Sequence, residues 1–381
     1  MQIRTKLPRV GTTIFSVMSQ LAMEHKAVNL GQGFPDFEGP QSLRDALAAA
    51  MNSGKNQYAP MTGIPKLREQ IALKTERLYG RKVSADTEVT VTSGATEALF
   101  AVIAATVRAG EEVIVLDPCY DSYEPAVELA GGRTVHVPLR LPDFSVDWQR
   151  VKDAIGKKTR LVIINSPHNP SGAVLEAADL DALAEILRGT EAIVLSDEVY
   201  EHIIFDGAAH QSVLRHAELA ARSFVVSSFG KTYHCTGWKV GYCIAPSQMS
   251  AEFRKVHQYL TFCTFNPAQW AFAEALERDP RHYLELPAFY QAKRDQFRAL
   301  IAPSKFKILP VKGAYFQLVD YSAISMQDDL NFSEWLVREA GVAAIPVSAF
   351  YETPPNARIV RLCFAKNDQT LNAAAERLCR L

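Results

Sequence analysis

From about residue 88 to residue 246, the chain alternates short, continuously apolar runs with longer stretches of helical periodicity. Most of the short runs are too uniformly apolar to have one wet face, which is typical of strands buried on both sides. This alternation predicts an α/β domain with a mainly parallel seven-stranded sheet covered by helices on both faces. The predicted strands are Glu88–Thr92, Val113–Asp117, Thr134–Pro138, Leu161–Asn165, Ile193–Asp197, Phe224–Ser228 and Val240–Ala245.

Helical patterns separate these strands. Thr96–Val107 precedes Gly110 and Ala177–Leu187 precedes Gly189, and each glycine stands where helices commonly end. After about residue 280 the pattern changes, which indicates a second, smaller α+β domain. There we predict helices at Tyr290–Ile301, Ser333–Ala340 and Thr370–Leu381, and strands at Lys307–Leu309, Tyr315–Val319 and Arg358–Phe364.

Composition supports a folded enzyme-sized chain that binds small molecules. Hydrophobic residues make up 48% and charged residues 22% of the 381 positions, enough apolar surface for one large domain and a smaller one. Lys and Arg number 41 against 42 Asp and Glu, so we expect no broad basic surface for nucleic acid or anionic lipid. The expected partners are small molecules.

The cysteines and the N-terminus point to the cytoplasm. Six cysteines, at positions 119, 235, 243, 263, 363 and 379, form no CxxC pair and no zinc spacing with histidine, so we expect reduced thiols and no metal. The apolar stretch after Arg4, Lys6 and Arg9 is interrupted by polar residues and lacks a cleavage site, which argues against a signal peptide. Because no window of 18 residues is apolar throughout, we expect no membrane span.

Polar residues follow several predicted strands, at the edge where open α/β sheets bind ligands. The first strand leads into Ser93–Thr96, a turn whose N–H groups suit a phosphate, although ordinary strand–helix junctions often look the same. The fourth leads into Asn165–Gly172, where two prolines would fix the aim of Asn169. The fifth ends at Asp197, whose carboxylate we expect to be half-buried and to need a cationic partner.

The sixth strand leads into Ser228–Lys231, which places a lysine at the tip of a strand. Most lysines are solvated surface residues, but lysine also forms Schiff bases with carbonyl cofactors. A phosphate turn, a carboxylate able to pair with a pyridinium nitrogen, a Schiff-base lysine and a nearby hydroxyl are the parts that a pyridoxal phosphate site requires. Together they predict pyridoxal 5'-phosphate as the cofactor.

These motifs resemble those of the fold-type I pyridoxal-phosphate aminotransferases of class I and II, over essentially the whole chain. The resemblance rests on Asn169–Gly172, Asp197-x-x-Tyr200, Ser228-x-x-Lys231 and Gly237-x-Lys239-x-Gly241. Asn29–Phe37, Asn56–Tyr58 and Arg361–Phe364 are most similar to the methionine aminotransferase and kynurenine aminotransferase (glutamine transaminase K) branch. The resemblance implies residues 1–38 as an N-terminal segment packing with the small domain, 39–279 as the large cofactor-binding domain and 280–381 as the small C-terminal domain.

The resemblance also implies a role for each residue around the cofactor. Lys231 would hold the cofactor as a Schiff base and then, once freed, act as general base and acid. Asp197 would keep the pyridine nitrogen protonated, Asn169 and Tyr200 would donate to the ring oxygen, and Tyr120 would stack on the ring. The phosphate ligands would be Gly94, Ala95, Thr96, Ser228, Lys239 and, from the other subunit of a homodimer, Tyr58. Lys239 stands where the family often has arginine, which replaces a bidentate fork with a point charge.

The substrate site is expected around Arg361, which needs an anion because it lies in an apolar run. The resemblance implies that Arg361 binds the substrate carboxylate, with Asn169 and Gly33 beside it. Phe15, Phe34 and Phe262 would surround the substrate side chain, Phe262 from the second subunit, although aromatic clusters are more often core than pocket. Because the expected lining contains no second cation, it favours methionine and aromatic amino acids over aspartate.

We therefore expect an aminotransferase that moves the α-amino group of methionine or aromatic amino acids to a 2-oxo acid through a pyridoxamine phosphate intermediate. One alternative keeps the cofactor but serves kynurenine, or ends in β-elimination from cysteine conjugates. Another is a non-catalytic cofactor-binding sensor domain of a transcription regulator. The sensor would need a DNA-binding domain, whereas here the aminotransferase-like sequence begins almost at once.

Overall fold

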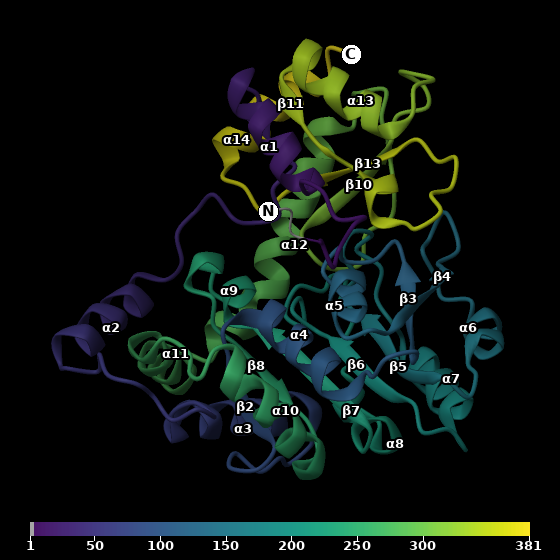
Figure 1. Cartoon of the computed structure of the whole chain (residues 1–381). Helices are drawn as coiled ribbons and strands as arrows, with labels where there is room; N and C mark the ends of the chain where they lie inside the picture. The colour runs from purple at the N-terminus through teal and green to yellow at the C-terminus, as the bar shows by residue number, and fades with distance from the viewer. Residues whose placement is uncertain (1–3) are drawn as a thin grey trace.

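The protein is described by a computed structural model that covers residues 4–381. Its largest sheet has seven strands in the order β2-β8-β7-β6-β5-β3-β4, and β8 pairs antiparallel with both of its neighbours while the other pairs are parallel (Figure 1). All seven predicted strands are confirmed. Their bounds are β2 Val89–Thr92, β3 Glu112–Asp117, β4 Arg133–Pro138, β5 Thr159–Asn165, β6 Ile193–Asp197, β7 Ser223–Ser228 and β8 Gly241–Ile244.

Both faces of this sheet are buried, as the uniformly apolar strands predict. In β3, Val113 and Val115 belong to one apolar cluster, whereas Ile114 belongs to another on the opposite face. Helices α4 (Gly94–Thr106), α5 (Tyr123–Leu129) and α10 (Ser247–Leu260) contribute to the first cluster. The second is covered by α3 (Pro65–Tyr79), α6 (Trp148–Ala154), α7 (Ala177–Leu187) and α11 (Asn266–Arg278), with α2 (Gln41–Asn52) against α11.

The C-terminal part forms a smaller α+β unit around a four-stranded antiparallel sheet in the order β12-β13-β10-β9. Its strands are β9 Lys307–Ile308, β10 Phe316–Asp320, β12 Ile345–Pro346 and β13 Ile359–Cys363, and its helices are α12 Arg281–Ile301, α13 Asp329–Trp335 and α14 Asp368–Leu378. The predicted elements are present. One difference is that Ser333–Ala340 is not one regular helix, because α13 passes into a π-helical turn at Leu336–Ala340 before Gly341 ends it in a left-handed conformation.

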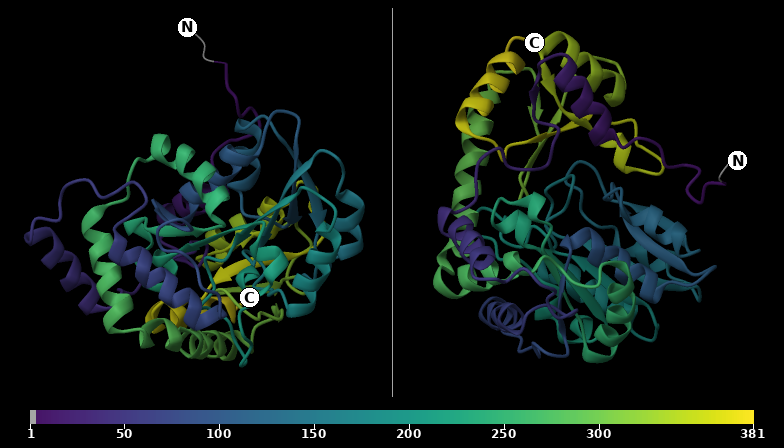
Figure 2. Two further views of the ribbon diagram at one scale, coloured as in Figure 1. Left: turned by 90° about the horizontal axis from the view of Figure 1, so that it is seen from below. Right: turned by 60° about the vertical axis from the view of Figure 1, so that its left-hand side comes forward.

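The N-terminal segment lies against this smaller unit (Figures 1 and 2). Helix α1 (Ile14–Glu24) buries Met18 and Leu21 against Val337 and Ile345, and β1 (Val28–Asn29) pairs parallel with β11 (Val342–Ala343). The predicted boundaries after residues 38 and 279 stay a prediction. Within residues 4–381, none of the helices combines the length and the apolarity that spanning a bilayer requires.

Candidate active site

A cavity of about 250 Å³ lies at the carboxyl ends of the sheet strands, where the small unit and the N-terminal segment meet the sheet. It brings together residues from the ends of β2, β5, β6 and β7 with Arg361 of β13. All but three of the predicted site residues line it. The predicted residues that line the cavity are Phe15, Gly33, Gly94, Ala95, Thr96, Tyr120, Asn169, Asp197, Tyr200, Ser228, Lys231, Lys239 and Arg361.

Lys231 lies on the short helix α9 (Phe229–Thr232), directly after β7. Its Nζ donates to the Gly33 carbonyl at 3.1 Å and to the Tyr315 hydroxyl at 2.8 Å. Burial disfavours the charged amine and lowers the pKa of Lys231 to about 8. A substantial fraction of this amine is therefore neutral near physiological pH, which a Schiff-base nucleophile and a general base both require.

Asp197 ends β6 and is 4% exposed. It accepts a hydrogen bond from the Tyr123 hydroxyl at 2.7 Å and one from the Val199 N–H at 3.4 Å. Burial nevertheless raises the pKa of Asp197 to about 6. Lys231 is close enough to oppose this rise, but within residues 4–381 no side-chain cation forms an ion pair with Asp197, so its expected cationic partner stays a prediction. The donors that it has are neutral, and a pyridinium N–H would supply the missing positive partner.

The start of α4 and Lys239 lie close together and could hold an anion. The first N–H groups of α4, around Gly94, Ala95 and Thr96, have no partner inside the helix. Gly94 has φ of +78°, and a Cβ there would lie 3.3 Å from the Lys239 Nζ. A Cβ on Gly241 would approach the Ser227 carbonyl to 2.6 Å and the Ala95 nitrogen to 3.0 Å, so glycine there lets β8 pack against this turn.

Arg361 projects from the middle of β13 and is 1% exposed. Its Nη1 donates to the Asn169 Oδ1 at 2.7 Å and its Nη2 to the Gly31 carbonyl at 2.9 Å, and Phe316 lies 4.0 Å from its guanidinium carbon. In the part of the chain that the structure describes, its buried Nε has no hydrogen-bond partner and it forms no ion pair. Burial disfavours the charged form and lowers the pKa of Arg361, so an anion entering the cavity beside this unpaired guanidinium would be stabilised by it.

Three predicted residues lie outside this cavity. Tyr58 is 81% exposed and its ring is 5.3 Å from that of Phe262, which is 44% exposed. Phe34 is 45% exposed, with the Lys366 amine over its ring. The roles of Tyr58 and Phe262 require a second subunit, and all three assignments stay predictions.

Several residues at the site were not predicted from the sequence. Gln32, Asn165, Thr236 and Phe316 line the cavity, while Tyr123 and Tyr315 contact Asp197 and Lys231 from behind. The spacing Tyr120-x-x-Tyr123 could have indicated that both tyrosines follow β3 into the site, because Tyr120 lies in the turn after β3 and Tyr123 begins α5. No local pattern links Tyr315 to Lys231.

The donor set fits pyridoxal phosphate. The buried carboxylate lacks a protein cation, the lysine has a lowered pKa, and glycines at positions 94 and 241 keep an anion site open at the start of α4. Asn169 uses its side-chain oxygen for Arg361, which leaves its NH₂ group to donate to a ring oxygen. Each group of the cofactor thus has a matching residue at this edge of the sheet.

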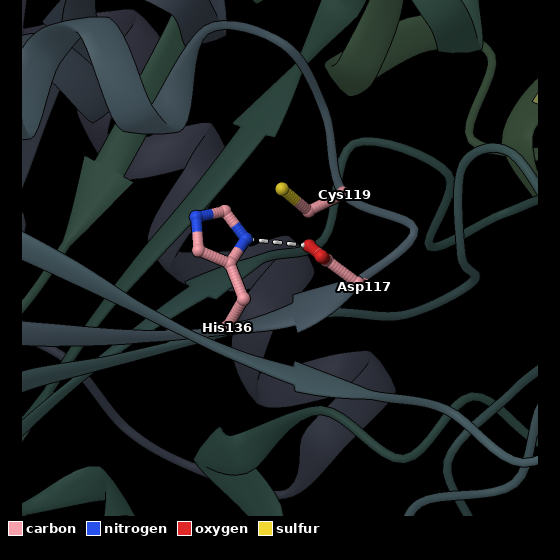
Figure 3. A group of neighbouring side chains, drawn as sticks. All are labelled: Asp117, Cys119 and His136. Atoms are coloured by element: carbon pink, nitrogen blue, oxygen red, sulfur yellow. Dashed lines mark hydrogen bonds and ion pairs between the residues drawn. The ribbon is translucent and has the colours of Figure 1, made fainter. Parts of the chain in front are cut away.

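A separate group at the end of β3 contains potential metal ligands. Figure 3 shows Asp117, Cys119 and His136, with ligand atoms within 4.8 Å of one another. The His136 Nδ1 already lies 2.8 Å from Asp117 Oδ1, and the other Asp117 oxygen accepts from the Glu352 N–H at 3.0 Å. Burial opposes a charge on His136, but the Asp117 bond and nearby carboxylates raise its pKa overall. We interpret this group as an ion pair between β3 and β4.

The fold and the site together define a pyridoxal-phosphate-dependent aminotransferase. The family model for aminotransferase class I and II matches residues 25–378, and the chain belongs to that family. Its members use pyridoxal 5'-phosphate to move an amino group between an amino acid and a 2-oxo acid. The predicted fold class, cofactor and enzyme class are confirmed.

The relatives support the predicted branch. The chain is 56% identical to the methionine aminotransferase of Escherichia coli strain K12, over 99% of this chain and 98% of the relative. A solved E. coli structure, described as identifying a methionine aminotransferase function, superposes with a TM-score of 0.98 at 56% identity and covers both chains fully. The kynurenine–oxoglutarate transaminase of Dictyostelium discoideum is 34% identical, over 97% of this chain and 94% of its own length.

Proposed function

We propose that this aminotransferase takes methionine and aromatic amino acids as donors. The observation that carries the proposal is the set of charges at the cavity. Arg361, flanked by Phe15 at 5.2 Å and Phe316 at 4.0 Å, reads the α-carboxylate. The other cations among the described lining residues are Lys231, which the chemistry uses, and Lys239 at the anion site. None remains for a side-chain carboxylate.

The chemistry follows from the positions of the side chains. Pyridoxal phosphate supplies a ring that accepts the electron pair left when the substrate Cα–H bond breaks. Lys231 takes that Cα proton and later returns a proton, which a pKa of about 8 allows near neutral pH. Asp197 would pair with the ring nitrogen, and Tyr200 and Asn169 would donate to the ring oxygen. Gly94, Ala95, Thr96, Ser228 and Lys239 would hold the phosphate, and Tyr120 would cover the ring face.

The donor preference can be tested by kcat/KM for methionine, phenylalanine and aspartate with one 2-oxo acid. Methionine and phenylalanine should exceed aspartate by at least 100-fold, because a buried carboxylate without a partner cation costs several kcal/mol. Lys231→Ala should abolish borohydride-reducible attachment of the cofactor. A clear preference for aspartate would refute the proposed specificity, and a Lys231→Ala variant that keeps reducible cofactor would refute the role of Lys231.

Kynurenine transamination is a second candidate, supported by the kynurenine transaminase relative and by the aromatic wall of Phe15 and Phe316. Adding kynurenine to the donor panel decides whether it belongs with the good donors. β-Elimination from cysteine conjugates would be detected as pyruvate formed without amino transfer.

All six cysteines are free, which favours a reducing compartment, and we place the enzyme in the cytoplasm on that basis.

We also propose that the enzyme is a homodimer with shared sites. Tyr58 and Phe262 contact each other on the surface rather than in the cavity, and Tyr259 and Phe265 beside them are 86% and 52% exposed. So many exposed rings on one face favour a covered interface. Mixing inactive Tyr58→Phe with inactive Lys231→Ala chains should restore activity, because one hybrid site receives both native residues. A fully active monomer in sedimentation would contradict this.

A further inference from the structure

Tyr315 closes a triangle of hydrogen bonds behind Lys231. The Lys231 Nζ donates to the Tyr315 hydroxyl at 2.8 Å, and that hydroxyl donates its own proton to the Gly33 carbonyl at 2.7 Å. The Gly33 carbonyl also accepts from Lys231 at 3.1 Å. Because the hydroxyl proton is committed to Gly33, the Tyr315 oxygen can act toward Lys231 only as an acceptor.

The ring of Tyr315 is held rigidly, so the position of this hydroxyl is fixed. The side chain is fully buried, with the rings of Tyr200, Phe316 and Tyr290 at centroid distances of 5.1, 5.0 and 5.7 Å. Its carbonyl accepts from the N–H of Phe364, immediately after β13, at 3.0 Å. An oxygen on a ring packed this closely cannot follow the lysine if the amine moves.

We propose that Tyr315 is a positioning residue for Lys231. Whenever the Lys231 amine is free, the Tyr315 hydroxyl accepts a hydrogen bond from it and holds it beside the cavity. Tyr315 and Gly33 occupy two of the directions around Nζ, and the remaining one is available to the cavity that Lys231 lines. The two oxygens also stabilise the ammonium form, because both accept hydrogen bonds from it. Tyr315 therefore fixes the position of the free amine and raises its affinity for a proton.

Other groups act on the same amine, and the hydroxyl adds to them. Asp197 of β6 and the Cys363 thiol of β13 favour its charged form, whereas Arg361 of β13 and Lys239 disfavour it. The Tyr200 ring lies 5.4 Å from Nζ and favours the cation, whereas Tyr315 meets Nζ through its hydroxyl edge. Tyr315→Phe leaves all these groups and both rings in place. It removes the hydrogen bond from Lys231 to the hydroxyl and the one from the hydroxyl to the Gly33 carbonyl, and only the first of them involves the amine.

The inference rests on the proposed role of Lys231, and it is tested on the apoenzyme. The measurement is the pH dependence of the rate at which pyridoxal phosphate becomes borohydride-reducibly attached, because only the neutral amine attacks the carbonyl. Tyr315→Phe should move the midpoint of this profile down by about one pH unit, the loss of one hydrogen bond to a charged group. The steady-state kcat should fall while KM for methionine changes little.

Tyr290→Phe is the matched control. It removes a hydroxyl from the same aromatic cluster, whose partner is the His234 Nδ1 at 3.0 Å and not Lys231. It should leave the midpoint unchanged. If Tyr315→Phe does not fold, 3-fluorotyrosine at position 315 keeps the ring and weakens the acceptor, and it should move the midpoint in the same direction by less.

The outcomes separate this inference from the function on which it rests. Equal midpoints for Tyr315→Phe, Tyr290→Phe and the unmodified enzyme overturn the positioning role and leave Lys231 as the cofactor lysine. If Lys231→Ala still attaches reducible cofactor, the proposed function fails and this inference with it. A downward shift in Tyr315→Phe alone, together with no attachment in Lys231→Ala, supports both.

Discussion

Replacing Arg361 with lysine tests the carboxylate site while keeping its positive charge. The guanidinium uses one N–H of Nη1 for Asn169 and one of Nη2 for the Gly31 carbonyl, and the second N–H on each nitrogen is available for a substrate carboxylate. A lysine ammonium has three N–H groups and no planar fork. Losing one charge-assisted hydrogen bond costs about 1.5–3 kcal/mol. At 1.4 kcal/mol per factor of ten, kcat/KM should fall about 10- to 150-fold.

The assay is kcat/KM for methionine, phenylalanine and tyrosine with the same 2-oxo acid, for the native enzyme and Arg361→Lys. All three donors should lose the same factor, because they share the α-carboxylate and differ only beyond Cβ. Phe15→Leu is the contrasting variant: its ring lies 5.2 Å from the guanidinium carbon, and its loss should change the ranking of donors instead. An Arg361→Lys enzyme within threefold of native activity, or one impaired for a single donor, would refute the reasoning.

Three further predictions concern the cofactor side of the cavity. Tyr123→Phe removes the hydroxyl that donates to Asp197 at 2.7 Å. Losing this hydrogen bond, worth about 1.4 kcal/mol, should lower kcat about tenfold. Unchanged kcat and cofactor affinity would contradict this prediction. Gly241→Ala should destabilise the apoenzyme by about 1–3 kcal/mol and weaken cofactor binding, because its Cβ would lie 2.6 Å from the Ser227 carbonyl; Gly237→Ala, with nothing within 4 Å, is the control. Finally, the raised pKa of Asp197 means that its ionised form destabilises the folded apoenzyme above about pH 6, and protonation relieves this as the pH falls toward 4. Asp197→Asn should therefore stabilise the apoenzyme at pH 8 by up to about 3 kcal/mol, at 1.36 kcal/mol per pH unit, and less at pH 5; equal gains in Tm at both would contradict it.

The large sheet could be predicted from the sequence because each strand carries its own signal. Strands buried on both faces need continuous apolar runs, and the runs ending at Asp117, Asn165 and Asp197 end where the strands end. The polar residues after them then gather at one edge, since parallel strands present their carboxyl ends together. Most of the cavity could thus be predicted before any contact was known.

The supporting residues could not be predicted, because their partners are distant in sequence. Tyr123 contacts Asp197 across 74 residues and Tyr315 contacts Lys231 across 84, and no periodicity encodes such pairs. The source of the cationic partner expected for Asp197 could not be predicted from burial alone, for a related reason. A buried carboxylate does need a positive partner, but the sequence cannot distinguish a side chain from a cofactor as its source.

The hydrogen bonds of Arg361 and Lys231 also connect the small unit, with residues 30–34 bonded to it, to the large sheet side of the cavity. Residues 30–34 are bonded to the small unit, because Lys366 donates to the Phe34 carbonyl at 2.8 Å and the Cys363 N–H donates to the Leu30 carbonyl at 2.7 Å. Gly33 therefore moves with β13 and Arg361. Three of the hydrogen bonds between this unit and the large sheet side lie at the cavity, from Arg361 to Asn169 and from Lys231 to Gly33 and Tyr315. Because these hydrogen bonds span the same two parts of the chain, a displacement of the small unit would change the surroundings of Arg361 and of the Lys231 amine together.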